Sequence, residues 1–264
     1  IEQEWAVIQQ DVLQERRTGG GSYKDLFSGF MLRLLGVGVL AWFLFQLCGM
    51  PVFTYYGPKL FRMARIDAFR FQMTTNSLGF ILSLPALWIV DRCGRTSILR
   101  WGAAGMATGM LSLGLLGTLG IVIPEHCREH DEIADCAHSP GRQEGDVANG
   151  TKVMIVASVI IFVASYSVSW GVVMNVYANE IFPTRFRARA AAIGACASWM
   201  ANFCMGQLTP MIMDDMHFRT FLVFFFVDLL GFLFAWWAPE TAHLHLEQII
   251  PLFERKLGKT HVMS

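Results

Sequence analysis

The chain has 264 residues, of which 54% are hydrophobic and 16% are charged, compared with about 25% charged residues in an ordinary soluble domain. Its 21 basic and 21 acidic residues cancel, so no charge excess points to a nucleic acid or an anionic partner. The six cysteines are dispersed, which excludes a small secreted domain built on disulfides.

The first 29 residues are polar and are predicted to form a surface helix and a linker, interrupted by three glycines at 19–21. They contain no secretory signal peptide and no initiator methionine, which is what we expect of a chain cut from a longer one.

Six apolar runs follow, and each can cross the roughly 30 Å hydrocarbon core of a bilayer, which needs about 20 helical residues. The runs are 30–56, 68–90, 98–123, 153–176, 190–213 and 218–238. Gly49 and Pro51 predict a kink in the first run, and the glycines and alanines of the third predict close helix packing. After 238, a polar tail is predicted to carry a short surface helix.

The predicted architecture is therefore an all-α membrane protein. A six-transmembrane-helix bundle at 30–238 lies between a linker at 1–29 and a tail at 239–264. An even number of spans places both termini on one side of the bilayer. That side carries thirteen of the Lys and Arg residues and the other side carries eight, so both termini are predicted to be cytoplasmic.

Charged residues are concentrated in two short turns between the runs. The first turn, 91–95, reads Asp-Arg-Cys-Gly-Arg. The second, 177–189, reads Tyr-Ala-Asn-Glu-Ile-Phe-Pro-Thr-Arg-Phe-Arg-Ala-Arg. Pro183 is predicted to end the helix before the second turn, because proline has no N–H and clashes with the preceding turn.

Four segments, in this order and spacing, resemble the C-terminal half of a sugar porter of the major facilitator superfamily. They are Gln46-Leu-Cys-Gly49 with Tyr55-Tyr56-Gly-Pro58, the stretch 85–95 ending in Asp-Arg-Cys-Gly-Arg, Glu180-Ile-Phe-Pro-Thr-Arg-Phe-Arg187, and Pro239-Glu-Thr241 with Leu246-Glu247. The resemblance implies helices seven to twelve of a plasma-membrane transporter that moves a sugar-like solute by alternating access. The N-terminal six helices, its partner half, would then be missing from this chain.

Alternating access needs a latch that closes in one state and breaks in the other, and clusters of weak ion pairs at helix ends suit this role. The resemblance places such a cytoplasmic gate at Asp91, Arg92, Arg95, Glu180, Arg185, Arg187 and Glu240. Thr96 stands where relatives usually carry a second arginine, so we expect a weaker latch. The alternative is that these charges only fix topology and loop shape.

A sugar presents hydroxyls and a weakly apolar face, so its site needs amides for hydrogen bonds and aromatic rings for stacking. The predicted substrate-binding residues are Gln46, Tyr55, Tyr56, Asn175, Trp199 and Asn202. The alternative is that the amides join helices and that the rings pack or lie at the membrane interface.

The chain also departs from the family pattern. Phe45, Pro51, Gly79 and Ser198 replace polar residues of the family. The stretch 171–175 reads Gly-Val-Val-Met-Asn where the family carries Gly-Pro-x-Pro-Trp. A transporter of a polyol or an organic acid, a non-transporting sensor and a truncated remnant therefore stay open as alternatives.

Three further features need an account. Asp228 lies in the middle of the sixth run, where a carboxylate costs about 2.5–3.5 kcal/mol on insertion scales, and we predict a protonated or hydrogen-bonded structural residue. In the loop before 150, a Cys127–Cys136 disulfide is favoured over a zinc site, and Asn149 begins a glycosylation sequon. No catalytic triad, nucleotide loop, metal site or cofactor motif is present in the sequence, which predicts no enzyme and no cofactor.

Overall fold

The computed structural model describes residues 23–63, 66–119, 149–242 and 246–257. Within these ranges the chain is helical apart from short connections, and it contains no strand. The helices are α2 (Tyr23–Leu26), α3 (Gly29–Leu47), α4 (Met50–Met63), α5 (Ala68–Cys93), α6 (Arg95–Thr118), α8 (Asn149–Val168), α9 (Trp170–Glu180), α10 (Thr184–Met216), the 3₁₀ turn η2 (His217–Arg219), α11 (Thr220–Trp237) and α12 (Leu246–Leu257).

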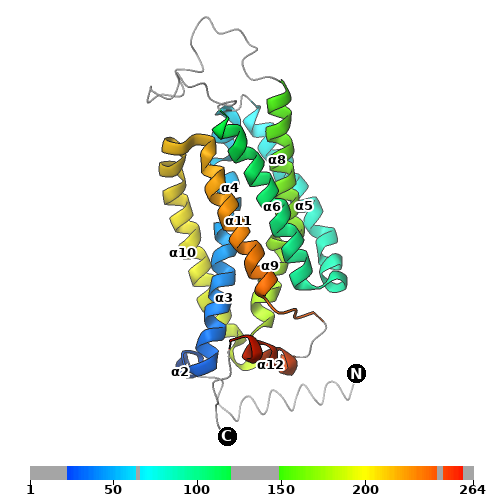
Figure 1. The fold of residues 1–264 in the computed structure, drawn as a ribbon, viewed down its shortest axis with the longest axis vertical. Helices are drawn as coiled ribbons and strands as arrows, with labels where there is room; N and C mark the ends of the chain where they lie inside the picture. Colours follow the sequence, from blue (N-terminus) through cyan, green and yellow to red (C-terminus); the bar gives the residue numbers. More distant parts are fainter. Residues whose placement is uncertain (1–22, 64–65, 120–148, 243–245, 258–264) are drawn as a thin grey trace, which may run out of the picture.

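The long helices stand side by side in an elongated bundle (Figure 1). The short helices α2 and α12 lie together at one end, which we call the α12 end; the other is the opposite end. The six predicted runs correspond to α3 with α4, α5, α6, α8 with α9, α10, and η2 with α11. The prediction of an all-α six-helix membrane bundle is confirmed.

Four continuous stretches of the described chain are long and apolar enough to cross a membrane. They are Gly29–Arg62, Ala68–Val90, Gly150–Glu180 and Thr184–Trp237. The last is 54 residues long and holds both α10 and α11, so it accounts for two of the six runs. The remaining run, α6, is rich in glycine and alanine, and the end of its predicted range lies outside the described residues.

The first run bends between α3 and α4, as predicted. Cys48 closes α3 by donating its N–H to the Leu44 carbonyl at 3.1 Å. Gly49 then has a φ of +90°, in the left-handed region that favours glycine. Pro51 falls in the first turn of α4, where its missing N–H has no helical partner to lose.

A second break separates α8 from α9 at Ser169, and the sequence analysis did not predict it. Ser169 has φ −119° and ψ −88°, and its hydroxyl donates to the Ser165 carbonyl at 2.5 Å. The next residue, Trp170, is buried, and its Nε1–H donates to the Leu99 carbonyl at 3.0 Å. The break contains no proline, and this hydrogen bond to α6 directly follows it.

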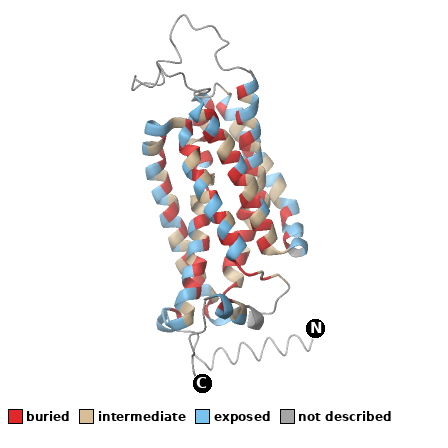
Figure 2. Ribbon diagram, in the orientation of Figure 1, coloured by how far each residue is buried: buried red, intermediate tan, exposed pale blue. Residues whose placement is uncertain are grey.

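Helix α6 runs through the middle of the bundle between α8 and α11, and its glycines allow close approach. A Cβ on Gly109 would lie 2.8 Å from the Ser158 carbonyl oxygen, and one on Gly114 would lie 3.1 Å from the Leu222 backbone nitrogen. Figure 2 shows buried residues concentrated along the inner faces of these helices. The prediction of close packing around the third run is confirmed.

Large aromatic side chains cover the outside of the bundle instead. Trp88, Trp101, Phe80, Phe203 and Trp199 are each at least 68% exposed. Apolar exposure on this scale is unusual for a soluble monomer and suits contact with lipid or with a second bundle.

Candidate functional site

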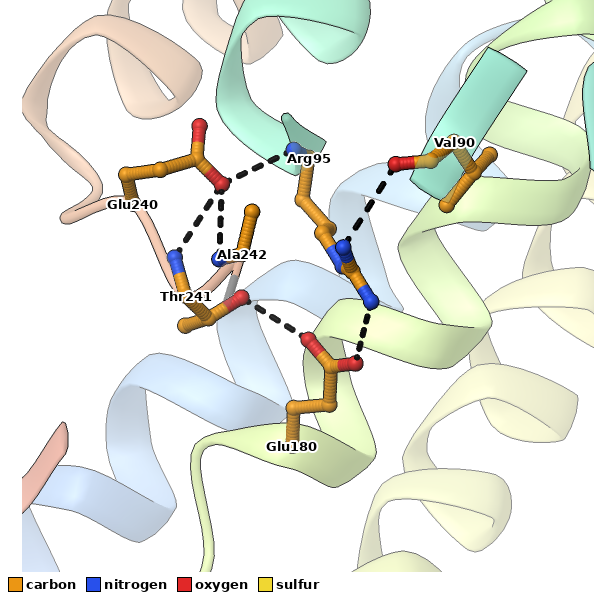
Figure 3. A network of polar contacts seen from close by, with 6 residues as sticks. All are labelled: Val90, Arg95, Glu180, Glu240, Thr241 and Ala242. Atoms are coloured by element: carbon orange, nitrogen blue, oxygen red, sulfur yellow. Dashed lines mark hydrogen bonds and ion pairs between the residues drawn. The ribbon is translucent and has the colours of Figure 1, made fainter. Parts of the chain in front are cut away.

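A polar network at the α12 end joins three segments that are far apart in the sequence (Figure 3). Gly94, with a φ of +81°, turns the chain so that α6 begins at Arg95 directly after α5. The Arg95 Nη2 donates to Glu180 Oε1 at 3.1 Å, and the two side chains are 13% and 28% exposed. Two of the predicted gate residues, from α6 and α9, are thus brought together.

Glu240, just after α11, caps the N-terminus of α6 from a distance. Its Oε1 accepts the backbone N–H of Arg95 at 2.8 Å, and its Oε2 accepts the N–H of Thr96 at 3.0 Å and the Thr96 hydroxyl at 2.6 Å. The N-cap residue itself, Gly94, has no side chain to do this. A carboxylate is favoured here because the helix N-terminus carries partial positive charge.

The pKa of Glu240 is lowered from its ordinary value by these contacts. Burial alone raises the pKa, but hydrogen bonds from the Thr96 hydroxyl and from the N–H groups of Ala242, Arg95 and Thr96 outweigh it. All of these donors favour the ionised carboxylate. Glu240 therefore acts as a fixed anion between α6 and the tail.

The network extends through side chains that the sequence analysis did not assign a role. Thr241 donates its hydroxyl to Glu180 Oε2 at 2.8 Å, so both Glu180 oxygens are engaged. The buried Tyr177 donates to the Pro239 carbonyl at 3.2 Å. Thr241 belongs to the Pro-Glu-Thr motif, and its position next to Glu240 in the sequence is the signal that could have predicted its contact with the network.

Thr96, which stands where the family usually has arginine, belongs to the network itself. Its hydroxyl donates to Glu240 and accepts from Arg100 Nη2 at 3.2 Å. Arg100 also donates to the Ala235 carbonyl at 3.1 Å, near the end of α11. A cation from α6 is therefore present one helical turn further along, and it contacts α11.

The remaining predicted gate residues are placed differently. Arg187 donates to the Phe182 carbonyl at 3.5 Å, within its own turn, and no ion pair with Glu180 occurs in the described chain. Arg185 approaches Asp25 of α2 at 4.0 Å. Arg92 is exposed, and the side chain of Asp91 lies outside the described part of the structure.

Toward the opposite end, three polar contacts join α4 to α10. Tyr55 donates its hydroxyl to Asn202 Oδ1 at 2.8 Å, and Tyr56 donates to the Gly206 carbonyl at 2.6 Å. Further along, Lys59 Nζ lies 2.7 Å from Asp214 Oδ1. The structure thus brings together Tyr55 and Asn202, two of the predicted substrate residues, while the Lys59–Asp214 pair was not predicted.

The other predicted substrate residues lie apart from that contact. Gln46 is half-buried near the end of α3, one turn before the break. Asn175 donates to the Gly171 carbonyl of its own helix at 3.2 Å. Trp199 is 70% exposed on α10. Phe45, which replaces a family glutamine, stacks on Tyr166 with ring centroids 6.0 Å apart.

Asp228 is 1% exposed in the middle of α11, and neither carboxylate oxygen has a hydrogen-bond partner in the described chain. The expectation of a hydrogen-bonded residue is therefore not met by the described residues, and the protonated alternative is the one that suits such burial.

In the described ranges, no group of three or more His, Cys, Asp or Glu side chains is placed to hold a metal ion. Cys48, Cys93, Cys196 and Cys204 are free thiols. The predicted Cys127–Cys136 disulfide lies outside the described residues, as does the side chain of the sequon residue Asn149.

A bundle of apolar helices with charged turns at one end is a multi-pass membrane protein. The family model "Sugar (and other) transporter" matches residues 1–253. The chain belongs to this family, and the predicted resemblance to sugar porters is confirmed.

Known relatives match almost the whole chain. Hexose transporter HXT13 of Saccharomyces cerevisiae is 28% identical over 262 residues, which are 96% of this chain and 43% of that protein. The arabinose-proton symporter of Bacillus subtilis is 31% identical over 238 residues, covering 88% and 45%. These relatives are named as transporters rather than enzymes, and the chain spans less than half their length.

Solved structures agree on the fold. A double-tryptophan mutant of XylE matches with a TM-score of 0.71 and 26% identity, covering 96% of this chain and 48% of that one. The proton:xylose symporter XylE bound to 6-bromo-6-deoxy-D-glucose matches with a TM-score of 0.67 and 25% identity, covering 96% and 48%.

Proposed function

We propose that this chain forms the C-terminal half of a sugar transporter and moves a sugar or sugar-like solute by alternating access. One observation carries the proposal: residues 1–253 match the sugar transporter family, yet the chain spans only 43–45% of its relatives. The partner is then an N-terminal six-helix half against which this bundle rocks in the bilayer.

The proposed solute site draws on four helices. It comprises Gln46 of α3, Tyr55 and Tyr56 of α4, Asn175 of α9, and Trp199 and Asn202 of α10. The Tyr55–Asn202 hydrogen bond supports this, because a sugar hydroxyl can replace either partner without leaving the other unsatisfied. The exposed ring of Trp199 is free to stack on a sugar face once the second half is present.

The proposed gate is the network at the α12 end, on the cytoplasmic side of the plasma membrane. Arg95, Glu180 and Glu240 are the members of this network that the sequence analysis predicted, and they hold α6, α9 and the tail together. Because the Arg95–Glu180 pair is partly exposed, its contribution is small enough to break during each cycle.

Solute uptake tests the proposed transport. The product of the complete coding sequence, including whatever lies upstream of residue 1, is reconstituted in liposomes and offered pentoses, hexoses, polyols and organic acids. We expect sugar uptake, and we expect Gln46→Ala to lower it about tenfold or more, the equivalent of one lost hydrogen bond of about 1.4 kcal/mol. Gln207→Ala, at an exposed position of α10, is the control and should leave uptake unchanged.

Each other outcome selects an alternative. Uptake of a polyol or an organic acid only would replace the sugar assignment. Solute binding without flux would indicate a sensor. A stop codon directly upstream, with rapid degradation of the product and no binding, would indicate a remnant.

Labelling of Cys93 tests the proposed orientation. Cys93 is exposed at the end of α5, at the α12 end. With a membrane-impermeant maleimide and identification of the labelled peptide by mass spectrometry, we expect labelling only after the cells are permeabilised. Asp215→Cys, at an exposed position near the opposite end, should label in intact cells. Labelling of Cys93 in intact cells would reverse the orientation.

A further inference from the structure

Asp228 is a buried acid that the proposed transport mechanism does not use. It is 1% exposed, and both of its oxygens lack a hydrogen-bond partner within the described residues. An ionised carboxylate left unpaired in an apolar interior is strongly disfavoured, so the group keeps a proton instead. The packing around Asp228 in this structure is therefore compatible with the protonated, neutral form of its side chain.

Its position relates it to the two broken helices. Phe224, one turn before Asp228 on the same face of α11, lies 3.2 Å from where a Cβ on Gly49 would be. Three residues after Asp228, a Cβ on Gly231 would lie 2.9 Å from the Trp170 ring. Asp228 thus lies between the α3–α4 break and the α8–α9 break.

The titratable and charged groups around Asp228 are few. Cys48 at the α3–α4 break and Tyr166 of α8 are the titratable groups on this side, and Phe45, three residues before Cys48, stacks on the Tyr166 ring. From α6, Arg100 contacts the Ala235 carbonyl two turns toward the α12 end, and the sequence after it to 118 holds no titratable residue. His217 and Arg219 of η2 lie at the opposite end of α11. Trp170 of α9 has no titratable group.

The α3–α4 break is where an ionised Asp228 could find donors. A helix N-terminus carries partial positive charge. Of the first three residues of α4, only Met50 has an N–H that can turn to a carboxylate, because Pro51 has none and the Val52 N–H donates to the Gly49 carbonyl at 3.0 Å. The N-terminus of α4 lies directly beyond Cys48 and Gly49. Moving it, or admitting water beside it, would satisfy the charge.

We propose that Asp228 is a proton-binding site that controls the α3–α4 break. With the proton bound, the break stays packed against α11 as in this structure. When the proton leaves to solvent, the carboxylate draws in the Met50 N–H and water, the break opens, and Cys48 becomes accessible. No other bond forms or breaks, and the inference does not depend on whether the chain transports a sugar.

Alkylation of Cys48 in the full chain, in lipid nanodiscs, tests this proposal. A small uncharged maleimide is applied at a series of pH values, and mass spectrometry quantifies modification of the Cys48 peptide. We expect the labelling rate of the unaltered chain, divided by that of Asp228→Asn, to rise about tenfold or more between about pH 6 and about pH 9, which corresponds to about 1.4 kcal/mol in the opening equilibrium. Asp215→Asn is the control, because that carboxylate is exposed, and its ratio should stay constant.

The opposite sign would overturn the proposal. If the ratio falls as the pH rises, ionisation of Asp228 does not open the break. A constant ratio would likewise leave Asp228 a structural residue.

One further variant and one measurement on the unaltered chain keep the test decisive if Asp228→Asn does not fold. Asp228→Glu keeps the acid and should restore the pH-dependent labelling. Infrared spectra of the unaltered chain should show a protonated-acid carbonyl band that persists at a pH where exposed carboxylates are ionised, and that disappears as Cys48 becomes reactive. Absence of that band at every pH would refute the proton site without any variant.

Discussion

Glu240→Ala is expected to lower the free energy of unfolding by about 2–4 kcal/mol, because it removes the N-terminal cap of α6 together with charge-assisted hydrogen bonds. The carboxylate accepts from the N–H groups of Arg95 and Thr96 and from the Thr96 hydroxyl, all within 3.0 Å. Without it these donors lose their partner in a half-buried site. The measurement is thermal or denaturant unfolding of the detergent-solubilised chain, followed by circular dichroism.

Glu240→Gln separates charge from shape. Its amide oxygen can replace one carboxylate oxygen, but the NH₂ group then faces other donors, so we expect a loss close to that of the alanine variant. Glu254→Gln, at an exposed position of α12, is the control and should unfold like the unaltered chain. An unaltered stability of Glu240→Ala would mean that α6 finds another cap, and it would remove Glu240 from the proposed gate.

The stabilisation by Glu240 should also depend on pH in a defined direction. Because its pKa is lowered in the folded state, its contribution is fully present above the unfolded value of about 4.3 and is lost as the pH falls through the lower folded pKa. The difference in stability between the unaltered chain and Glu240→Gln should therefore shrink on acidification below about pH 4.3.

The apolar runs and the kink at Gly49 followed from local chemistry. A run of about 20 apolar residues indicates a membrane span wherever it occurs, and Gly49 with Pro51 two residues later favours a helix break. The break at Ser169 could not be predicted in this way. Trp170 is held by the Leu99 carbonyl, which belongs to another helix 71 positions away.

The charged residues of the network at the α12 end were predicted from the sequence, and the geometry of their contacts was not. Arg95, Glu180 and Glu240 were expected at one end of the bundle, and they meet there. A helix cap normally comes from the residue before the helix, whereas here it comes from a carboxylate 145 positions along the chain, since Gly94 has no side chain. Arg187 was expected near Glu180, but its own turn provides a closer acceptor at Phe182.

Gly49→Ala is expected to destabilise the bundle by about 1–3 kcal/mol, because an L-residue is strained at a φ of +90° and the new methyl group meets the core. The Phe224 ring lies 3.2 Å from the new Cβ, and the end of the Met110 side chain lies 2.5 Å from it. The flexible methionine can yield more easily than the ring. Unfolding in denaturant measures the change.

Gly36→Ala is the matched control, since Gly36 lies inside α3 with nothing within 4 Å of an added Cβ. Alanine there should be neutral or stabilise by about 0.5–1 kcal/mol, through the lower entropy cost of the helix. If both variants behave alike, the break does not need glycine at position 49. If only Gly49→Ala loses stability, the left-handed conformation of Gly49 is required at the break. That conformation then sets the direction of α4, whose Tyr55 and Tyr56 contact α10.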